Sequence, residues 1–207
     1  MTYSSIKATK GKDFTPVPTG LHLAICYQVI ALGNQKFKNS VTPRVWLGFE
    51  LPEVTIETKE GKRPMTIGKE YALFIGGKSK LGDALKNWRG KPFTDAELEA
   101  FEVTGVAGKI CQLQVSNKES DPSKTEINMV AGLINAQKQL LKEGKISDKP
   151  SNRVVVYNPD AHDDTMWELV PEFLKRKIKE RITDEEANAA APAQHSPKDD
   201  FDDDIPF

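Results

Sequence analysis

Cysteine and histidine are scarce in this sequence, which has two and three of them in 207 residues. Cys26 and Cys111 are too few and too far apart for a disulfide framework or a zinc site, so we expect two buried free thiols. The sequence also lacks the run of ~18 to 20 apolar residues that a membrane helix needs. It has no apolar N-terminal run that predicts a signal peptide. We therefore expect a cytoplasmic protein without a membrane segment.

Residues that support catalysis do not gather in any motif. His162, Asp163 and Asp164 in "AHDD" resemble a metal-binding pair, but a metal-dependent hydrolase needs more converging ligands, so we interpret the stretch as an exposed acidic loop. "GGKS" at 76–79 resembles the end of a phosphate-binding loop, yet Ala72 stands where that motif requires glycine. We expect no enzyme activity, no catalytic residue, no metal and no cofactor.

Charge is divided unevenly along the chain. Residues 1–181 hold 28 basic and 22 acidic side chains, a net charge of +6, whereas residues 182–207 hold one basic and eight acidic side chains, a net charge of −7. The sequence therefore predicts a mildly basic body that carries an acidic tail, with disorder confined to the tail.

Apolar residues alternate with a period of two in several stretches of the first 150 residues, which is typical of strands with one buried face. Val45, Leu47, Phe49 and Leu51 form the core side of one such stretch. Helical patterns interrupt the strands after the third one, where Thr94 and Glu97 predict a capping box. We predict a mainly β domain over 1–150, a five-stranded Greek-key barrel of the OB type with a helical insert after the third strand. A β-sandwich is the structural alternative. The expected strands are 15–32, 41–51, 54–73 (a hairpin turning at 60–61), 106–119 and 125–134.

A second unit, residues 151–182, is predicted to add a short strand and an amphipathic helix. Leu174, Ile178 and Ile182 recur at helical spacing behind Pro171. We expect this unit to pack on the barrel or on a second copy of the chain, so a homo-oligomer is possible. Residues 183–207 are predicted to be disordered: 183–198 form a tether that spans roughly 20 to 25 Å, and 199–207 form an acidic tip.

Basic and aromatic residues predict a nucleic-acid surface on the barrel. In OB barrels the second and third strands and the loops beside them bind nucleic acid. Single strands stack their bases on aromatic rings while lysine and arginine contact the phosphates. We expect Trp46 to be exposed on the non-core face, although ordinary surface lysines and a half-buried tryptophan explain the same pattern. Trp88 is either a second stacking site or, as we favour, an anchor for the helical insert. The predicted DNA-binding residues are Lys36, Phe37 and Lys38 in the first long loop, Arg44 and Trp46 on the second strand, and Lys62 and Arg63 at the hairpin.

The acidic tip carries a family resemblance. "DDFDDDIPF" resembles the C-terminal tip of bacterial single-stranded DNA-binding proteins, in which clustered aspartates precede Ile-Pro-Phe or Leu-Pro-Phe. "FTPVPTGLHLAICYQVI", the helical insert and "LVPEFLKRKIKER" resemble the single-stranded DNA-binding replication proteins of tailed bacteriophages, a divergent OB-fold family. The partner-binding residues that this implies are Asp199, Asp200, Phe201, Asp202, Asp203, Asp204, Ile205, Pro206 and Phe207.

The resemblance implies a function as well as a fold. It implies a phage protein of the bacterial cytoplasm that coats and protects single-stranded DNA, with little sequence preference, during replication and recombination. Its tip would recruit replication, recombination or repair proteins, because an aromatic ring beside carboxylates suits an apolar hole with a basic rim. The same polyanion can compete with DNA for the basic body. An adaptor or DNA mimic that captures host enzymes is the alternative, and annealing activity stays open.

Overall fold

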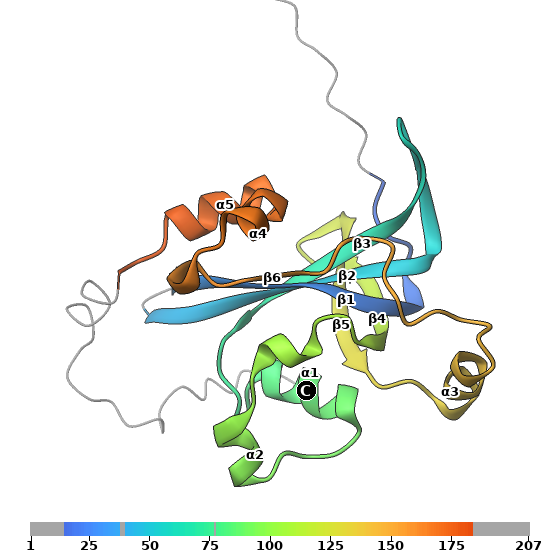
Figure 1. Ribbon diagram of the computed structural model, residues 1–207, viewed down its shortest axis with the longest axis horizontal. Helices are drawn as coiled ribbons and strands as arrows, with labels where there is room; N and C mark the ends of the chain where they lie inside the picture. Colours follow the sequence, from blue (N-terminus) through green and yellow to red (C-terminus); the bar gives the residue numbers. More distant parts are fainter. Residues whose placement is uncertain (1–14, 38–39, 77, 184–207) are drawn as a thin grey trace, which may run out of the picture.

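The fold is built on five strands that form a nearly closed antiparallel barrel. The structure is a computed structural model that describes residues 15–37, 40–76 and 78–183 (Figure 1). The strands lie in the order β3-β2-β1-β4-β5. This arrangement confirms the predicted mainly β, five-stranded barrel, and the β-sandwich alternative is wrong. The bounds are β1 Gly20–Phe37, β2 Ser40–Thr58, β3 Gly61–Ala72, β4 Ile110–Lys118 and β5 Asp121–Ala131.

A seam between β3 and β5 is where the barrel stays partly open. β3 and β5 are the two end strands of this order. Each is separated from β1 by two antiparallel pairings, so both run parallel to β1. The Lys69 ammonium group bridges the seam and donates to the Ile127 carbonyl oxygen over 2.6 Å. A side chain therefore spans a gap that backbone hydrogen bonds close elsewhere.

The barrel core follows the two-residue period of the sequence. Val45, Leu47, Phe49 and Leu51 are at most 2% exposed, and they meet the inward residues of the other strands and one face of α1. Burial of alternate residues is the expected result when a strand has one apolar face, because each apolar side chain removed from water stabilises the fold. The predicted core side of this strand is confirmed.

The helical insert lies between β3 and β4, on the opposite side of the barrel from α4 and α5 (Figure 1). Ser79 caps its first helix by accepting a hydrogen bond from the Gly82 amide, 2.9 Å away. The Trp88 indole donates to the Ile110 carbonyl oxygen over 2.9 Å, and its ring lies 5.9 Å from that of Phe49. Trp88 therefore anchors the insert, as expected. The insert comprises α1 Lys80–Arg89, α2 Asp95–Ala100, which has the predicted capping box, and the 3-10 turn η1 Val103–Val106.

The first long loop predicted from the sequence is wrong, because β1 and β2 continue through it as a two-stranded arm. A register shift next to Gly33, whose φ is 70°, lets β1 extend beyond the barrel. The Gln35 amide donates to the Lys177 carbonyl oxygen over 3.0 Å, and the Ile182 amide donates to the Asn34 carbonyl oxygen over 2.9 Å. Contacts with the C-terminal segment thus stabilise strands in a stretch whose composition favours a turn.

The C-terminal segment packs on the outer face of the same barrel. β6 pairs in parallel with β1, and a second core cluster fills the space between the barrel and α5. Leu174 and Ile178, which the helical spacing singled out, are 0% and 2% exposed. The elements are α3 Asn135–Lys142, which sequence patterns missed, β6 Val155–Tyr157, the 3-10 turn η2 Pro159–Ala161, α4 Asp164–Leu169 and α5 Glu172–Lys179.

Several sequence predictions fall outside the described residues. Lys38 and the whole acidic tip, 199–207, belong to this group. Among the described helices, none has the length and apolar content that spanning a bilayer requires.

Candidate nucleic-acid interface

The outer face of β1, β2 and β3, where nucleic acid was predicted to bind, is covered at its centre by the C-terminal segment. Glu50 on β2 points away from the barrel core and is 0% exposed. Its carboxylate accepts hydrogen bonds from the Ser151 and Asn152 amides, both at 2.8 Å, and from the Asn152 side-chain amide at 2.7 Å. Three donors compensate for burying this charge. The centre of the face is therefore a protein contact.

Trp46 lies on the predicted face, but the expectation that it is exposed is wrong. Its indole rests on the cross-strand pair of Gly48 and Gly68, where a Cβ at Gly68 would approach the ring to 2.2 Å. Phe173 of α5 covers the ring edge-on, with centroids 5.3 Å apart. The indole Nε1 is buried and has no hydrogen-bond partner within the described chain. Two glycines and α5 together hold Trp46 half-buried.

Phe173 presents an exposed aromatic ring on this face. It is 44% exposed and is supported from beneath by Trp46. Sequence analysis missed it because Leu174 and Ile178 alone explained the apolar stripe of the helix. The available signal was its position next to that stripe and four residues before Lys177, since an aromatic and a cation at this spacing share one side of a helix.

An ion-pair network lies beside the two rings. The Glu70 carboxylate, on β3, accepts a hydrogen bond from Arg44 Nε at 2.9 Å and also forms an ion pair with the Lys177 ammonium group. Burial alone would raise the pKa of Glu70, but the hydrogen bonds and charges of Lys177 and Arg44 outweigh it and lower that pKa. Two cations therefore surround one carboxylate, which leaves the network a net charge of +1. Arg44, predicted to contact DNA, is engaged here with a side chain only 17% exposed.

The C-terminal segment adds cations to the arm formed by β1 and β2. Lys36 is exposed near its end, and Phe37 pairs with Ser40 at the tip through the backbone. The Arg181 side chain lies against Gly33 and is 37% exposed, whereas that of Lys177 is 45% exposed. Arg181 Nη2 lies 4.0 Å from a carboxylate oxygen of Asp160. We refer to the four cations of the arm and of the segment packed on it as the basic arm: Lys36, Arg44, Lys177 and Arg181.

Lys62 and Arg63, at the start of β3, pair with the other end of β2. Lys62 is opposite Glu57 in the strand register, whereas Lys36 is opposite Val41. At about 3.3 Å per residue, roughly 50 Å of strand separates the two ends. Arg63 pairs with Glu60 in the hairpin turn, and both side chains are more than half exposed. The predicted DNA-binding residues therefore form two groups, and α5 packs against the first of them.

No protein-family model, curated protein or solved structure matches the chain. In residues 15–37, 40–76 and 78–183, no three His, Cys, Asp or Glu side chains are grouped as a metal site requires. The surface features that bear on nucleic-acid binding at this face are the basic arm, the supported ring of Phe173 and the cations of the hairpin.

Proposed function

We propose that this protein binds single-stranded DNA through an OB-type barrel and coats it with little sequence preference. A partly open, five-stranded barrel with helices between its third and fourth strands supports the OB assignment. In this class of barrel, the second and third strands and the loop after the first strand contact oligonucleotides. The arm and the outer edge of β3 correspond to these elements.

The observation that carries the proposal is that the basic arm and the Phe173 platform are adjacent. Lys177 joins them, because it follows Phe173 by one helical turn and pairs with Glu70 next to Arg44. Single strands need an exposed ring for a base and cations along the backbone. A ring backed by Trp46 is held in place before a base arrives, which reduces the entropy cost of stacking.

The acidic tip has a separate role in the proposal. Residues 199–207 recruit replication, recombination or repair proteins by offering an aromatic ring among carboxylates to a basic, apolar pocket. The same residues compete with DNA for the basic arm. A phage origin and the host cytoplasm are part of this proposal and rest on the resemblance of the tip and body.

The test compares salt dependence in two charge-matched variants. Replacing Lys36, Lys177 and Arg181 with glutamine removes three cations of the basic arm. Each phosphate contact contributes about 0.7 to the slope of log affinity against log salt for single strands, so the slope should become shallower by about 2. The control replaces three exposed lysines of α1 and α3, Lys86, Lys138 and Lys142, and should keep the parent slope. Equal slopes in both variants would show that the arm does not bind DNA.

One observation favours a second function. The centre of the outer face is closed by the chain itself, since Glu50, Trp46 and Arg44 all have partners in the C-terminal segment or in β3. A body with a closed face suits an adaptor that binds protein and uses its acidic tip to capture replication or repair enzymes. Such a protein would fail to bind oligo-dT even when 199–207 are deleted.

A further inference from the structure

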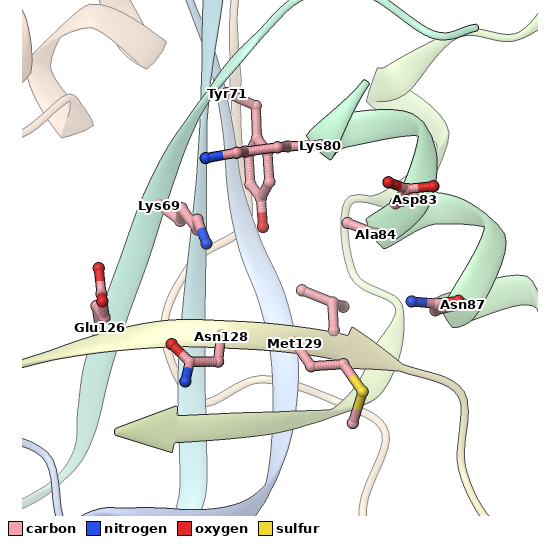
Figure 2. Close-up of a pocket in the computed structure, with 10 residues that line it drawn as sticks. Lys69, Tyr71, Lys80, Asp83, Ala84, Asn87, Glu126, Asn128 and Met129 are labelled. Carbon is pink, nitrogen blue, oxygen red and sulfur yellow. The ribbon is translucent and has the colours of Figure 1, made fainter. Parts of the chain in front are cut away.

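A cleft of about 390 Å³ opens at the seam where β3 and β5 meet, and α1 forms its remaining wall (Figure 2). It lies apart from the basic arm, which the strand-binding proposal uses. Its volume falls within the range of small-molecule sites, about 300 to 1,000 Å³. The cleft is therefore large enough for a ligand and has walls from three different elements.

Tyr71 directs a hydroxyl group into the cleft. The side chain is 4% exposed, and its hydroxyl points into the cleft (Figure 2). Within the described residues this hydroxyl forms no hydrogen bond. Burial raises the pKa of Tyr71, so the group stays a neutral phenol that donates and accepts. The hydroxyl can therefore donate a hydrogen bond to, or accept one from, a molecule that enters the cleft.

Two ammonium groups enter the cleft, that of Lys69 from β3 and that of Lys80 from the first residue of α1 (Figure 2). Lys69 donates one proton to the Ile127 carbonyl oxygen and keeps two for another acceptor. Burial lowers the pKa of Lys69, Glu126 opposes that effect, and the positive charge of Lys80 adds to it. Among described residues, neither lysine forms an ion pair. The ammonium groups of Lys69 and Lys80 therefore suit an anionic group of a ligand in the cleft.

Amide side chains complete the lining. Asn87 enters from α1 and Asn128 from β5, and each offers both donors and an acceptor (Figure 2). Asp83 and Glu126 balance the two lysines, so the lining carries no net charge. A simple anion has no net attraction to such a cleft. A ligand that combines an anionic group with a donor and acceptor edge matches it on both counts.

We propose that the seam cleft binds one nucleotide, with its phosphate at Lys69 and Lys80, its base edge at the asparagine amides, and a hydrogen bond to the Tyr71 hydroxyl. Asparagine amides pair with the donor and acceptor pattern of a base, adenine above all. The proposal is independent of strand binding, because a free nucleotide and a nucleotide within a strand offer the same groups.

The location is tested by amide NMR shifts of the full chain during titration with dAMP, inorganic phosphate and deoxyadenosine. We expect dAMP to shift the amides of Lys69–Tyr71, Lys80–Asn87 and Glu126–Val130 with one saturable curve, and each fragment to bind more weakly. Saturation by phosphate at the strength of dAMP would show an anion site and overturn the proposal. An absence of shifts in these segments at millimolar dAMP would also overturn it.

Two variants separate ligand binding from folding. Tyr71→Phe removes only the unpartnered hydroxyl, so the midpoint of thermal unfolding should stay or rise while dAMP binds about tenfold more weakly. Lys80→Gln should weaken dAMP by at least that factor, whereas Lys86→Gln, on the same helix outside the cleft, should have no effect. Unchanged dAMP affinity in Tyr71→Phe and Lys80→Gln would refute the site.

The source of the nucleotide is distinguished by a second ligand. If the cleft holds a nucleotide of a strand, the two cleft variants should weaken oligo-dA by the same factor as dAMP. If it holds free nucleotide, oligo-dA affinity should stay at the parent value while dAMP affinity falls. If the protein bound no single-stranded DNA at all, the proposed function would be wrong, whereas the dAMP result would still test the cleft.

Discussion

Replacing Phe173 with alanine tests the stacking platform directly. Base stacking on an aromatic ring is worth about 1 to 3 kcal/mol by alanine substitution. Because 1.4 kcal/mol corresponds to a factor of ten, the affinity for oligo-dT should fall about 5- to 150-fold. The replacement Phe173→Trp keeps a ring at this position and should retain most of the affinity. Fluorescence anisotropy of a labelled oligo-dT at fixed salt measures both.

The same substitution has a calculable cost in folding. Phe173 is 44% exposed, so alanine loses roughly half the burial energy of a phenylalanine together with the edge contact to Trp46. These contributions sum to about 2 kcal/mol in the free energy of unfolding. Urea unfolding gives that value, and binding should be compared only under conditions where the variant is folded.

Phe93→Ala is the matched control. Phe93 is half-buried and contacts Phe101 edge-on with centroids 5.0 Å apart, on the helical insert across the barrel from α5. Its loss should cost a similar free energy of unfolding and leave oligo-dT affinity unchanged. If Phe93→Ala and Phe173→Ala weaken binding equally, the loss comes from stability, and the platform does not stack a base.

Three further predictions concern the buried groups that hold the fold together. Glu50→Ala removes an acceptor of three hydrogen bonds and should lower the free energy of unfolding by about 3 kcal/mol in urea titrations; a loss below about 1 kcal/mol would contradict this account. The lowered pKa of Glu70 means that its contribution to stability is present above the pKa of the unfolded carboxyl and is lost as pH falls through the folded value. Glu70→Gln should therefore lose less stability than the parent between neutral and acid pH, and parallel curves would contradict this. Burial raises the pKa of Cys26 to about 12 and that of Cys111 well above its usual value, so neither thiol should react with Ellman's reagent until the protein unfolds.

Local patterns predicted the barrel because each strand carries its own signal. The alternation of Val45, Leu47 and Phe49 identifies a buried face without knowledge of the neighbouring strands. The capping box at Thr94 and the spacing of Leu174 and Ile178 are equally local. These features are confirmed because the residues that specify them lie within one or two turns or one strand of each other.

The parts that were wrong depend on contacts between distant segments. The arm replaces a predicted loop because Gln35 and Asn34 bond to residues about 140 positions away. Trp46 was expected in solvent, yet α5 covers it with Phe173. The two-residue period of β2 predicted the face of the strand on which Trp46 lies. No local pattern specifies which helix packs on that face.

The sequence predicted individual residues of the candidate interface but not how they are arranged. Arg44 and Lys36 both lie on the arm, but Lys177 of α5 and Arg181, which follows α5, come from a segment that the sequence placed in a separate unit. Lys62 of β3 pairs with the opposite end of β2, and the length of this 19-residue strand separates it from Lys36. Strand length was the quantity that sequence patterns underestimated.

The most direct test of the central claim is binding to fluorescent oligo-dT and to a duplex of the same length, at low and moderate salt. It compares the full chain with a form that ends at Lys198. The proposal predicts salt-sensitive binding that prefers the single strand and that strengthens when residues 199–207 are removed, because the acidic tip no longer competes for the basic arm. Equal binding of single strand and duplex, or no binding by either form, would contradict it and leave the adaptor function as the account to pursue.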